Sequence, residues 1–528
     1  MSGSARQVLR NGMIVDGSEG EPYLADLAIR GDRIEAVGDV PAESGDVDVD
    51  CTGRLLMPGF VDAHSHGDGK VFDPDVQLAL LRQGVTTLIG GQDGVSYAPG
   101  NGHYAAEYFA AINGPHPTYR GSRVSHLLTT YDHTTRINVA YLVPAGTVRH
   151  EVMGRSTATA TAQEMGRMRY LITEGLRDGA VGLSSGLDYV PGLYSDTAEL
   201  TALCEPVAAA GAVYVTHMRG GYEANSAAGV SEIAAISRHS GVRTHISHFH
   251  AAADTLLPIL AGLRNDGIDT TFDAYPYTRG CTLLAMPLLP PELAIRPVDE
   301  ILVELASPKT RAALRRDWFP LVDQKPSLGP EWPTMITLGH IRAPEYAWAH
   351  GLTIAEGAVR AGVDVIDFAL DVLLASQLEV NAIMAVRYAR PVAELGRILS
   401  HDQHVGGSDG IFVGAHPHPR AHGTFARYLR EFVREHNFYT WAVAVAHLAT
   451  RPAEIFQLGQ RGRLAPGQIA DLIVVDPAAV VDRATYEHPL TLATGIGDVF
   501  VAGERVLRDG HLTEVLPGRG LRRVPIGR

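Results

Sequence analysis

Residues 212–249 give the clearest indication of the fold. They read AVYVTHM (212–218), then SAAGVSEIAAISRHSG (226–241), then RTHISHF (243–249). The two outer runs are short and apolar, which is typical of buried strands, and the middle run has the spacing of an amphipathic helix. A strand, a helix and a second strand within about 30 residues indicate a βαβ unit, whose two strands are parallel.

The same alternation extends through the middle of the chain. Short apolar runs are separated by helical patterns such as TAQEMGRMRYLITEGLRDG (161–179), and their number suits an α/β fold of the TIM-like (β/α)8 barrel type. The runs are VTTLIGG (85–91), INVAYLV (137–143), AVGLSS (180–185), AVYVTHM (212–218), RTHISHF (243–249), TTFDAYP (270–276), MITLG (335–339) and VGGSDG (405–410). A Pro-rich, irregular segment at about 283–334 is expected to be an insertion over the barrel mouth.

Both ends of the chain differ from this middle part. Residues 1–57 and 455–528 contain alternating apolar runs with Asn-Gly and Gly-Asp turns, for example QVLRNGMIVDG (7–17) and GRLAPGQIADLIVVDP (462–477). We expect the two pieces to form one small, discontinuous β-sandwich domain. Residues 58–454 would then form the barrel.

Composition narrows the classes of function. The 528 residues carry 45 Lys+Arg and 59 Asp+Glu, a formal net charge of −14, which argues against a nucleic-acid partner and against a polybasic membrane-surface protein. The chain start shows no apolar signal core, and no run of about 20 apolar residues predicts a membrane span. Cys51, Cys204 and Cys281 are too few and too scattered for a disulfide framework, so a cytoplasmic location is expected. The sequence carries no signal for an oligomeric state.

Histidine is the unusual component, with 23 copies. The motif PGFVDAHSHGD (58–68) places His64 and His66 at the end of a predicted strand, where residues i and i+2 point the same way. Two imidazoles on one side of a strand end can hold a metal ion, and histidine is its commonest ligand. The alternative, two surface histidines in a loop, is less consistent with the apolar residues that precede them.

Two further histidines and one aspartate have the same placement. His217 and His248 end neighbouring predicted strands, 31 residues apart, so both would project at one barrel rim. Asp409 follows the last apolar run, and a carboxylate there could bind a metal and move a proton. Singly, each histidine is better explained as an ordinary core or loop residue and Asp409 as part of an Asp-Gly turn, but the joint placement of the two histidines at strand ends favours metal ligands. His250 lies two residues after His248 and His245 three residues before it, and both stay open as alternatives.

These motifs resemble the amidohydrolase superfamily, and within it the N-acyl-D-amino-acid deacylase (D-aminoacylase) group. The resemblance covers nearly the whole chain, in family order. It rests on PGFVDAHSHGD (58–68), QGVTTLIGGQDG (83–94), VGLSSGLDYVPGLYSDTAEL (181–200), VTHMRGG (215–221), ISHFH (246–250), FDAYPYTRG (272–280), GSDG (407–410) with HPHPR (416–420), HLATRPAEIFQL (447–458) and GRLAPGQIADLIVVDP (462–477). It implies a (β/α)8 barrel with a β-sandwich built from both termini.

The resemblance also implies roles for individual residues. His64 and His66 match the first metal pair, His217 and His248 match the second-site histidines, and Asp409 matches the catalytic aspartate, which also binds metal. Arg420 matches the arginine that holds the substrate's free carboxylate, and Tyr189 matches a tyrosine that assists it. The implied substrate is therefore a small molecule with a free carboxylate.

Two positions depart from the family pattern. Asp93 stands where such deacylases typically have a metal-binding cysteine, and His250 stands where they often have a lysine that contacts the substrate. A carboxylate can bridge two metals, but an oxygen ligand weakens the preference for zinc that a thiolate gives. We therefore expect one or two zinc ions, with another divalent metal as the alternative. His250, a candidate substrate contact, adds positive charge near pH 7 only when it is protonated.

The implied chemistry is metal-dependent hydrolysis of a linear amide C–N bond. The expected reaction is deacylation of an N-acyl-D-amino acid to a D-amino acid and a carboxylate, with Asp409 as proton acceptor and then donor. Alternatives are a cyclic-amide or dipeptide hydrolase of the same superfamily, or a non-catalytic scaffold homologue. GLSSG (182–186) formally matches a nucleophile elbow at Ser184, but LDYVPG follows it and predicts a loop instead of a helix.

Overall fold

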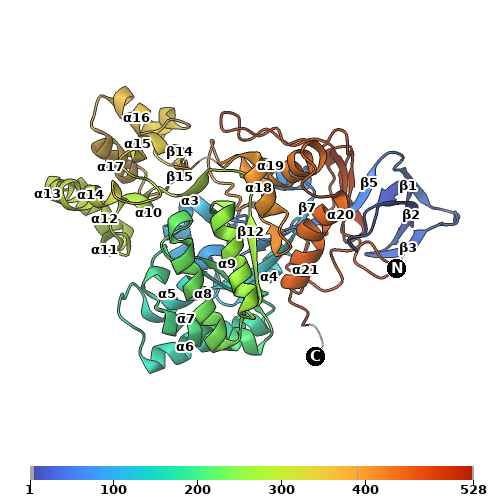
Figure 1. Ribbon diagram of the computed structural model, residues 1–528, viewed down its shortest axis with the longest axis horizontal. Helices are drawn as coiled ribbons and strands as arrows, with labels where there is room; N and C mark the ends of the chain where they lie inside the picture. The colour runs from blue at the N-terminus through green and yellow to red at the C-terminus, as the bar shows by residue number, and fades with distance from the viewer. Residues whose placement is uncertain (1–4, 389, 526–528) are drawn as a thin grey trace.

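The computed structural model describes residues 5–388 and 390–525, and a barrel of eight parallel strands forms its centre (Figure 1). The strands pair in chain order, and the Ala63 N–H, just after the first strand, donates to the Gly406 carbonyl of the last at 3.0 Å, which closes the barrel. The strands are β6 (Phe60–Asp62), β7 (Val85–Gly90), β8 (Asn138–Pro144), β9 (Gly182–Gly186), β10 (Val213–His217), β11 (Arg243–Ile246), β12 (Thr270–Ala274) and β16 (His404–Gly406).

Helices connect the strands and cover the outside of the barrel. The sequence marks their ends: α6 begins with a capping box between Thr161 and Glu164, and α8 ends at Gly241, whose φ of 74° suits a residue without a side chain. The barrel helices are α1 (Pro74–Leu81), α2 (His103–Tyr108), α3 (Ala110–Asn113), α4 (Val124–Tyr131), α5 (Ala145–Met153), α6 (Ala162–Arg177), α7 (Thr197–Ala209), α8 (Ser226–Ser240), α9 (Ala253–Asn265), α18 (Val392–Leu399), α19 (Arg420–Arg427), α20 (Trp441–Val445) and α21 (Arg451–Ile455).

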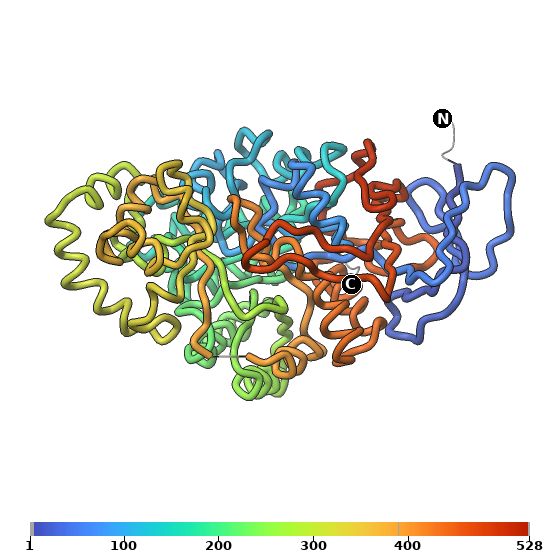
Figure 2. The backbone as a smooth tube through the Cα atoms, turned by 90° about the horizontal axis from the view of Figure 1, so that it is seen from above, coloured from blue at the N-terminus to red at the C-terminus, as the bar shows by residue number. Residues whose placement is uncertain are grey.

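An inserted unit separates β12 from α18 and forms one end of the molecule (Figures 1 and 2). It has its own hydrophobic core, which includes Leu288, Trp332 and Phe368, around a three-stranded antiparallel sheet. Its elements are β13 (Gly280–Leu283), α10 (Ala285–Leu288), α11 (Pro291–Ala294), α12 (Val298–Ala306), α13 (Pro308–Ala313), α14 (Phe319–Val322), α15 (Trp332–Met335), β14 (Ile336–Ile341), α16 (Ile354–Ala361), α17 (Val365–Ala375) and β15 (Val380–Met384).

One of the expected barrel strands belongs to this unit. The run MITLG (335–339) falls in β14, which pairs antiparallel with β15 and packs Ile336 and Leu338 into the core of the insertion. The strand that completes the set of eight is β6, the first barrel strand in chain order, which has only three residues. The strands and helices of the insertion reach from 280 to 384, beyond the segment 283–334 that the proline content marked.

The two ends of the chain pair in one nine-stranded sheet at the opposite end of the molecule (Figures 1 and 2). β17 runs antiparallel to β5, with Leu472 opposite Pro58, and Leu27, Leu56 and Phe500 are among the buried residues of its core. The strands are β1 (Gln7–Ile14), β2 (Tyr23–Arg30), β3 (Arg33–Gly38), β4 (Val47–Asp50), β5 (Leu55–Pro58), β17 (Leu472–Val475), β18 (Ile496–Val501), β19 (Glu504–Arg508) and β20 (His511–Leu512). The barrel therefore lies between a terminal β domain and the insertion.

Candidate metal centre and active site

Four histidines and two aspartates meet at the carboxyl end of the barrel. They are His64 and His66 after β6, Asp93 after β7, His217 at the end of β10, His248 after β11, and Asp409 after β16. Parallel strands bring their carboxyl ends to one rim, which is where barrel enzymes carry their active sites. None of the six is more than 8% exposed. The structure thus brings together all the ligand candidates named from the sequence.

Asp93 lies at the centre of this group. Its Oδ1 is 3.6 Å from His64 Nε2 and 3.8 Å from His248 Nε2. Its Oδ2 is 3.6 Å from His66 Nε2 and 3.8 Å from His217 Nδ1. Each carboxylate oxygen therefore faces two imidazole nitrogens, an arrangement in which one carboxylate can contact two ions.

Asp409 adds a second carboxylate on the other side of the first histidine pair. Its Oδ1 is 3.3 Å from His66 Nε2 and 3.7 Å from His64 Nε2. Its Oδ2 forms an ion pair of 2.8 Å with Nη2 of Arg420, a residue with no exposed surface. One oxygen of Asp409 thus faces the histidines, while the other is held by a guanidinium.

These donors fit a divalent metal ion. The ligand atoms of His64, Asp93 and His248 lie within 4.8 Å of one another, and so do those of His64, His66 and Asp409. His64 Nε2 and Asp93 Oδ1 are buried and have no hydrogen-bond partner among the described residues, which is costly unless a ligand satisfies them. Imidazole and carboxylate are ligands that zinc and similar ions accept.

Outer contacts orient the imidazoles. Asp273 Oδ2 is 3.4 Å from His64 Nδ1, and its Oδ1 accepts the backbone N–H of His248 at 2.9 Å. Asn113 Oδ1 is 3.0 Å from His66 Nδ1, which turns the Nε2 of that ring toward the centre. Such carboxylate and amide partners fix the tautomer and the orientation of metal-binding histidines.

His217 is oriented by its other ring nitrogen. Asp188 Oδ2 lies 3.2 Å from His217 Nε2, so Nδ1 faces the centre. His245, one of the open alternatives, points its Nε2 to Asp273 at 3.0 Å and so supports the site from outside. Sequence reasoning named none of Asp273, Asn113 and Asp188. Asp273 and Asp188 both had a signal, because Asp273 lies at the end of β12 within FDAYPYTRG (272–280) and Asp188 follows β9 within VGLSSGLDYVPGLYSDTAEL (181–200).

The electrostatics of the centre also suit a cation. Burial on its own would raise the pKa of Asp93, but the histidines around it hold this pKa well below its usual range. Burial would lower the pKa of His66, but Asp409 and Asp93 raise it to about 10. The two carboxylates therefore stabilise positive charge among the imidazoles, whether a proton or a metal carries it.

The residues expected to bind substrate lie beside this centre. The guanidinium of Arg420 stacks on Tyr275 at 4.6 Å, and its Nε and Nη1 have no hydrogen-bond partner among the described residues. Tyr189 packs its ring 5.1 Å from that of His217 and shares a 2.9 Å hydrogen bond with Thr282 Oγ1 of β13. The insertion thus supplies part of the wall of the site.

His250 also borders this wall. Its ring centre is 4.3 Å from that of Tyr275, so His250 and Arg420 both pack against Tyr275. Burial and the nearby charge of Arg390 hold the pKa of His250 well below its usual range, so its ring is neutral near pH 7. His250 therefore offers a hydrogen-bonding group and no charge.

Ser184 has a supporting role. Its Oγ accepts the Gly94 N–H at 3.2 Å and donates to the Gly91 carbonyl, on either side of Asp93. The Ser184 hydroxyl therefore holds the turn that carries Asp93 and is not free to act as a nucleophile.

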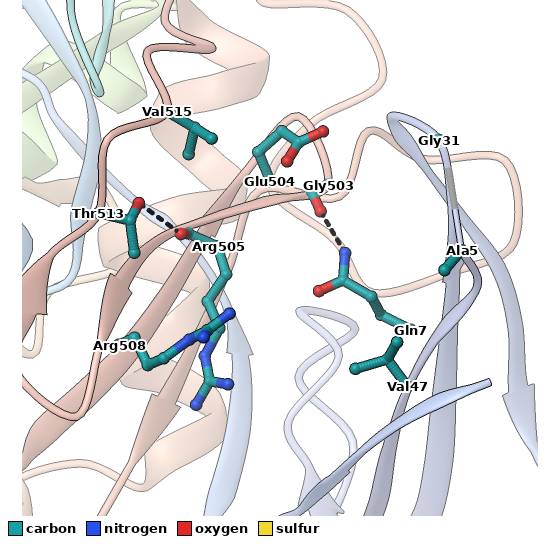
Figure 3. A pocket seen from close by; sticks show the side chains of 10 residues that line it. All are labelled: Ala5, Gln7, Gly31, Val47, Gly503, Glu504, Arg505, Arg508, Thr513 and Val515. Carbon is teal, nitrogen blue, oxygen red and sulfur yellow. Dashed lines mark hydrogen bonds between the residues drawn. The ribbon is translucent and has the colours of Figure 1, made fainter. Parts of the chain in front are cut away.

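An open cavity elsewhere carries no such chemistry. It has a volume of about 420 Å³, lies in the terminal β domain, and is crossed by a 2.8 Å hydrogen bond from Gln7 Nε2 to the Gly503 carbonyl (Figure 3). Gln7, Glu504 and Arg508 are among the residues that line it, and none of its lining residues is a metal-ligand candidate. In the part of the chain that the structure describes, no helix is both long and apolar enough to cross a membrane.

Comparison with known proteins gives full-length matches. A family model described as "Amidohydrolase family" matches residues 48–288 and 355–507, and the gap between them lies within the insertion. An N-acyl-D-glutamate deacylase from Alcaligenes xylosoxydans xylosoxydans is 33% identical over 98% of this chain and 96% of its own length. A D-aminoacylase from the same organism is 31% identical over 98% and 97%.

Comparison with solved structures also finds a deacylase similar over nearly the full length. The N-acyl-D-glutamate deacylase from Bordetella bronchiseptica, solved with zinc and a phosphonate inhibitor, superposes with a TM-score of 0.82 at 29% identity, covering 98% of this chain and 99% of that one. A D-hydantoinase superposes with a TM-score of 0.59 at 15% identity, covering 99% and 100%, which is a likeness of fold alone.

Proposed function

The chain belongs to the amidohydrolase family, and from this premise we propose that it is a metal-dependent hydrolase that releases D-amino acids from their N-acyl forms. The observation that carries the proposal is the cluster of four histidines, Asp93 and Asp409, with the buried Arg420 on the far oxygen of Asp409. Its full-length relatives at 31–33% identity are N-acyl-D-amino-acid deacylases.

Two groups of side chains would hold the metal in this proposal. His64, His66 and Asp409 form one, His217 and His248 form the other, and Asp93 contacts both. A divalent cation held there supplies Lewis-acid polarisation of the amide carbonyl and lowers the pKa of water. Zinc, as one or two ions, is the expected metal, and the oxygen donors of Asp93 leave room for another divalent metal.

Asp409 moves the proton. Its Oδ1 faces the histidines, where the attacking water must lie, and its Oδ2 is fixed by Arg420 at 2.8 Å. Burial would raise the pKa of Asp409, but Arg420 and the neighbouring histidines lower it, so the carboxylate is ionised and ready to accept a proton. Asp409 then protonates the departing nitrogen as the C–N bond breaks.

Arg420 and Tyr189 bind the free carboxylate of the substrate. Two of the buried Arg420 nitrogens have N–H groups without a partner among the described residues, and the fork of a guanidinium matches a carboxylate in geometry. His250, neutral and next to Tyr275, would add a hydrogen bond. The substrate is accordingly a small molecule with a carboxylate next to the amide. The three free cysteines suit a cytoplasmic location, which we include in the proposal.

A reconstitution assay tests the proposal. The metal is removed from the purified protein with a chelator and zinc is added back, and amine release is then followed from N-acetyl-D-amino acids, from their L-enantiomers and from a hydantoin. We expect activity on D-substrates that disappears with chelation and returns with zinc. Activity only on rings would favour the cyclic-amide alternative, and activity only on L-substrates would also overturn the assignment. No turnover of any substrate by metal-loaded protein would favour a scaffold homologue.

A further inference from the structure

A second buried guanidinium borders the same wall of the site. Arg390 lies just before α18, where the chain returns from the insertion to the barrel, and its side chain is 3% exposed. Its Nη2 donates one long hydrogen bond of 3.4 Å to the Thr278 carbonyl. Its Nε and Nη1 have no hydrogen-bond partner among the described residues. An arginine has five N–H donors, and buried donors are normally satisfied.

Glu223, the carboxylate that pairs with Arg390 in the described part of the chain, is poorly placed for a hydrogen bond to it. Glu223 Oε1 is 3.4 Å from Arg390 Nη1, yet neither atom has hydrogen-bond geometry toward any described residue. Burial raises the pKa of Glu223, although the charge of Arg390 opposes this shift. Arg390 therefore keeps both charge and donors that a carboxylate from a ligand could satisfy.

Arg390 and Arg420 both lie close to Tyr275 and His250, and the charges of both guanidiniums act on these two rings. Arg420 stacks on Tyr275, and the ring of His250 lies 4.3 Å from Tyr275. Arg390 bonds to Thr278, three residues after Tyr275, and its partner Glu223 donates its backbone N–H to the His250 carbonyl at 3.2 Å. The two guanidiniums thus flank one wall built by Tyr275 and His250.

This placement assigns the two guanidiniums to one part of the substrate. If Arg420 holds the α-carboxylate, the wall it shares with Arg390 faces the amino-acid half of the molecule, whereas the acyl carbonyl lies at the metal centre. We propose that Arg390 binds the side-chain carboxylate of an acidic D-amino acid, so that the enzyme prefers N-acyl-D-glutamate or N-acyl-D-aspartate. The inference rests on the proposed deacylase function and adds to it the class of side chain.

A pair of isosteric substrates tests the assignment. N-acetyl-D-glutamate and N-acetyl-D-glutamine differ by one charged oxygen, so the ratio of their kcat/KM values reports the charge at the side-chain subsite. A hydrogen-bonded ion pair in a buried site corresponds to about a 10- to 100-fold preference for the glutamate substrate in the zinc-loaded wild-type enzyme. Arg390→Gln should reduce this ratio to about 1, chiefly by raising KM for N-acetyl-D-glutamate.

Two more variants make the test decisive. Arg397→Gln, an exposed arginine of α18 paired with Asp254, is the matched control and should leave the ratio unchanged. Glu223→Gln removes the competing carboxylate and should increase the ratio, which keeps the idea testable if Arg390→Gln does not fold. A wild-type enzyme that hydrolyses both substrates equally, or an Arg390→Gln variant that keeps the preference, would overturn the inference.

The acyl end provides the remaining comparison. If N-succinyl-D-leucine is hydrolysed faster than N-acetyl-D-leucine, and Arg390→Gln removes that difference, then Arg390 binds a carboxylate on the acyl group and the assignment is wrong. Failure of the deacylase proposal itself has a different signature, because no N-acyl-D-amino acid would then be hydrolysed at all.

Discussion

Replacing Asp273 by Asn should weaken metal binding without unfolding the barrel. One oxygen of Asp273 lies 3.4 Å from His64 and 3.0 Å from His245, and the other accepts the His248 N–H at 2.9 Å. Asp273 therefore couples His64 and His248, two of the four candidate metal-ligand histidines. An amide of nearly the same shape removes the negative charge and turns one acceptor into a donor.

The size of the effect follows from these contacts. Burial would raise the pKa of Asp273, but His64 and His245 hold it far below its usual range, so the native carboxylate is ionised and its interaction with the imidazoles is charge-assisted. Loss of such a partner to a metal-binding histidine typically lowers metal affinity about 10- to 100-fold, which is about 1.4 to 2.7 kcal/mol. The Asn amide keeps the steric fit, so the fold should lose much less than this.

The measurement is zinc affinity by competition with a chromophoric chelator, on wild type and on Asp273→Asn, with thermal unfolding of the metal-free proteins alongside. Asp471→Asn is the matched control, because Asp471 is also a buried carboxylate but bonds to Asn138, at the start of β8 and away from the rim. It should lower stability and leave zinc affinity unchanged. Wild-type zinc affinity in Asp273→Asn would refute the positioning role, as would an equal loss in Asp471→Asn.

Three further changes have distinct expected outcomes. Asp409→Asn should lower kcat by about 100-fold or more with protein folding intact, because it removes the proton acceptor, and undiminished turnover in a steady-state assay would contradict this role. Arg420→Met should raise KM for an N-acyl-D-amino acid by about 100-fold, since it deletes the partner of the substrate carboxylate, and an unchanged KM would remove it from the binding site. Burial and Arg120 lower the pKa of His116 to about 3, whereas an unfolded histidine takes up a proton near pH 6.5. Stability from His116 is thus fully present above pH 6.5 and falls by about 1.4 kcal/mol per unit as pH drops toward 3. His116→Gln should flatten the pH dependence of the thermal midpoint between pH 6.5 and 4.5, and an unaltered slope would count against this account.

The barrel could be predicted from sequence because its strands are buried on both faces. Such strands are continuous apolar runs, and helices of regular length separate them, as between β10 and β11. The assignment of MITLG (335–339) to the barrel was wrong for a related reason. A short apolar run indicates a buried strand but does not reveal which sheet the strand joins. β6 has only three residues, which is too short for an apolar pattern to identify it as a barrel strand. The histidine motif that follows it nevertheless indicated the metal site.

The metal-ligand histidines could be predicted because each of them closely follows or ends a barrel strand. His64 and His66 follow one strand, and His217 and His248 each follow a strand, so the rule that strand ends share a rim brings them together. Asn113 could not be found this way, because it approaches His66 from the end of α3, in a long connection after β7. Arg390 likewise reaches the site wall from a segment that follows the insertion, and no spacing in the chain encodes that approach.

The backbone of the site explains why its assembly depends on the whole barrel. Asp93, His248 and Asp409 have φ values of 54°, 33° and 50°, a region that costs a non-glycine residue roughly 1–3 kcal/mol. Glycine would relieve this strain but would delete a donor. Bonds between different βα units hold two of these three residues in place: the Asp409 N–H donates to the His64 carbonyl at 2.7 Å, and the His248 N–H to Asp273 at 2.9 Å. The first of these bonds joins the end of β16 to the end of β6, where the barrel closes. Closing the barrel and forming the metal centre are therefore one structural event, and a chain that fails to close should lose both.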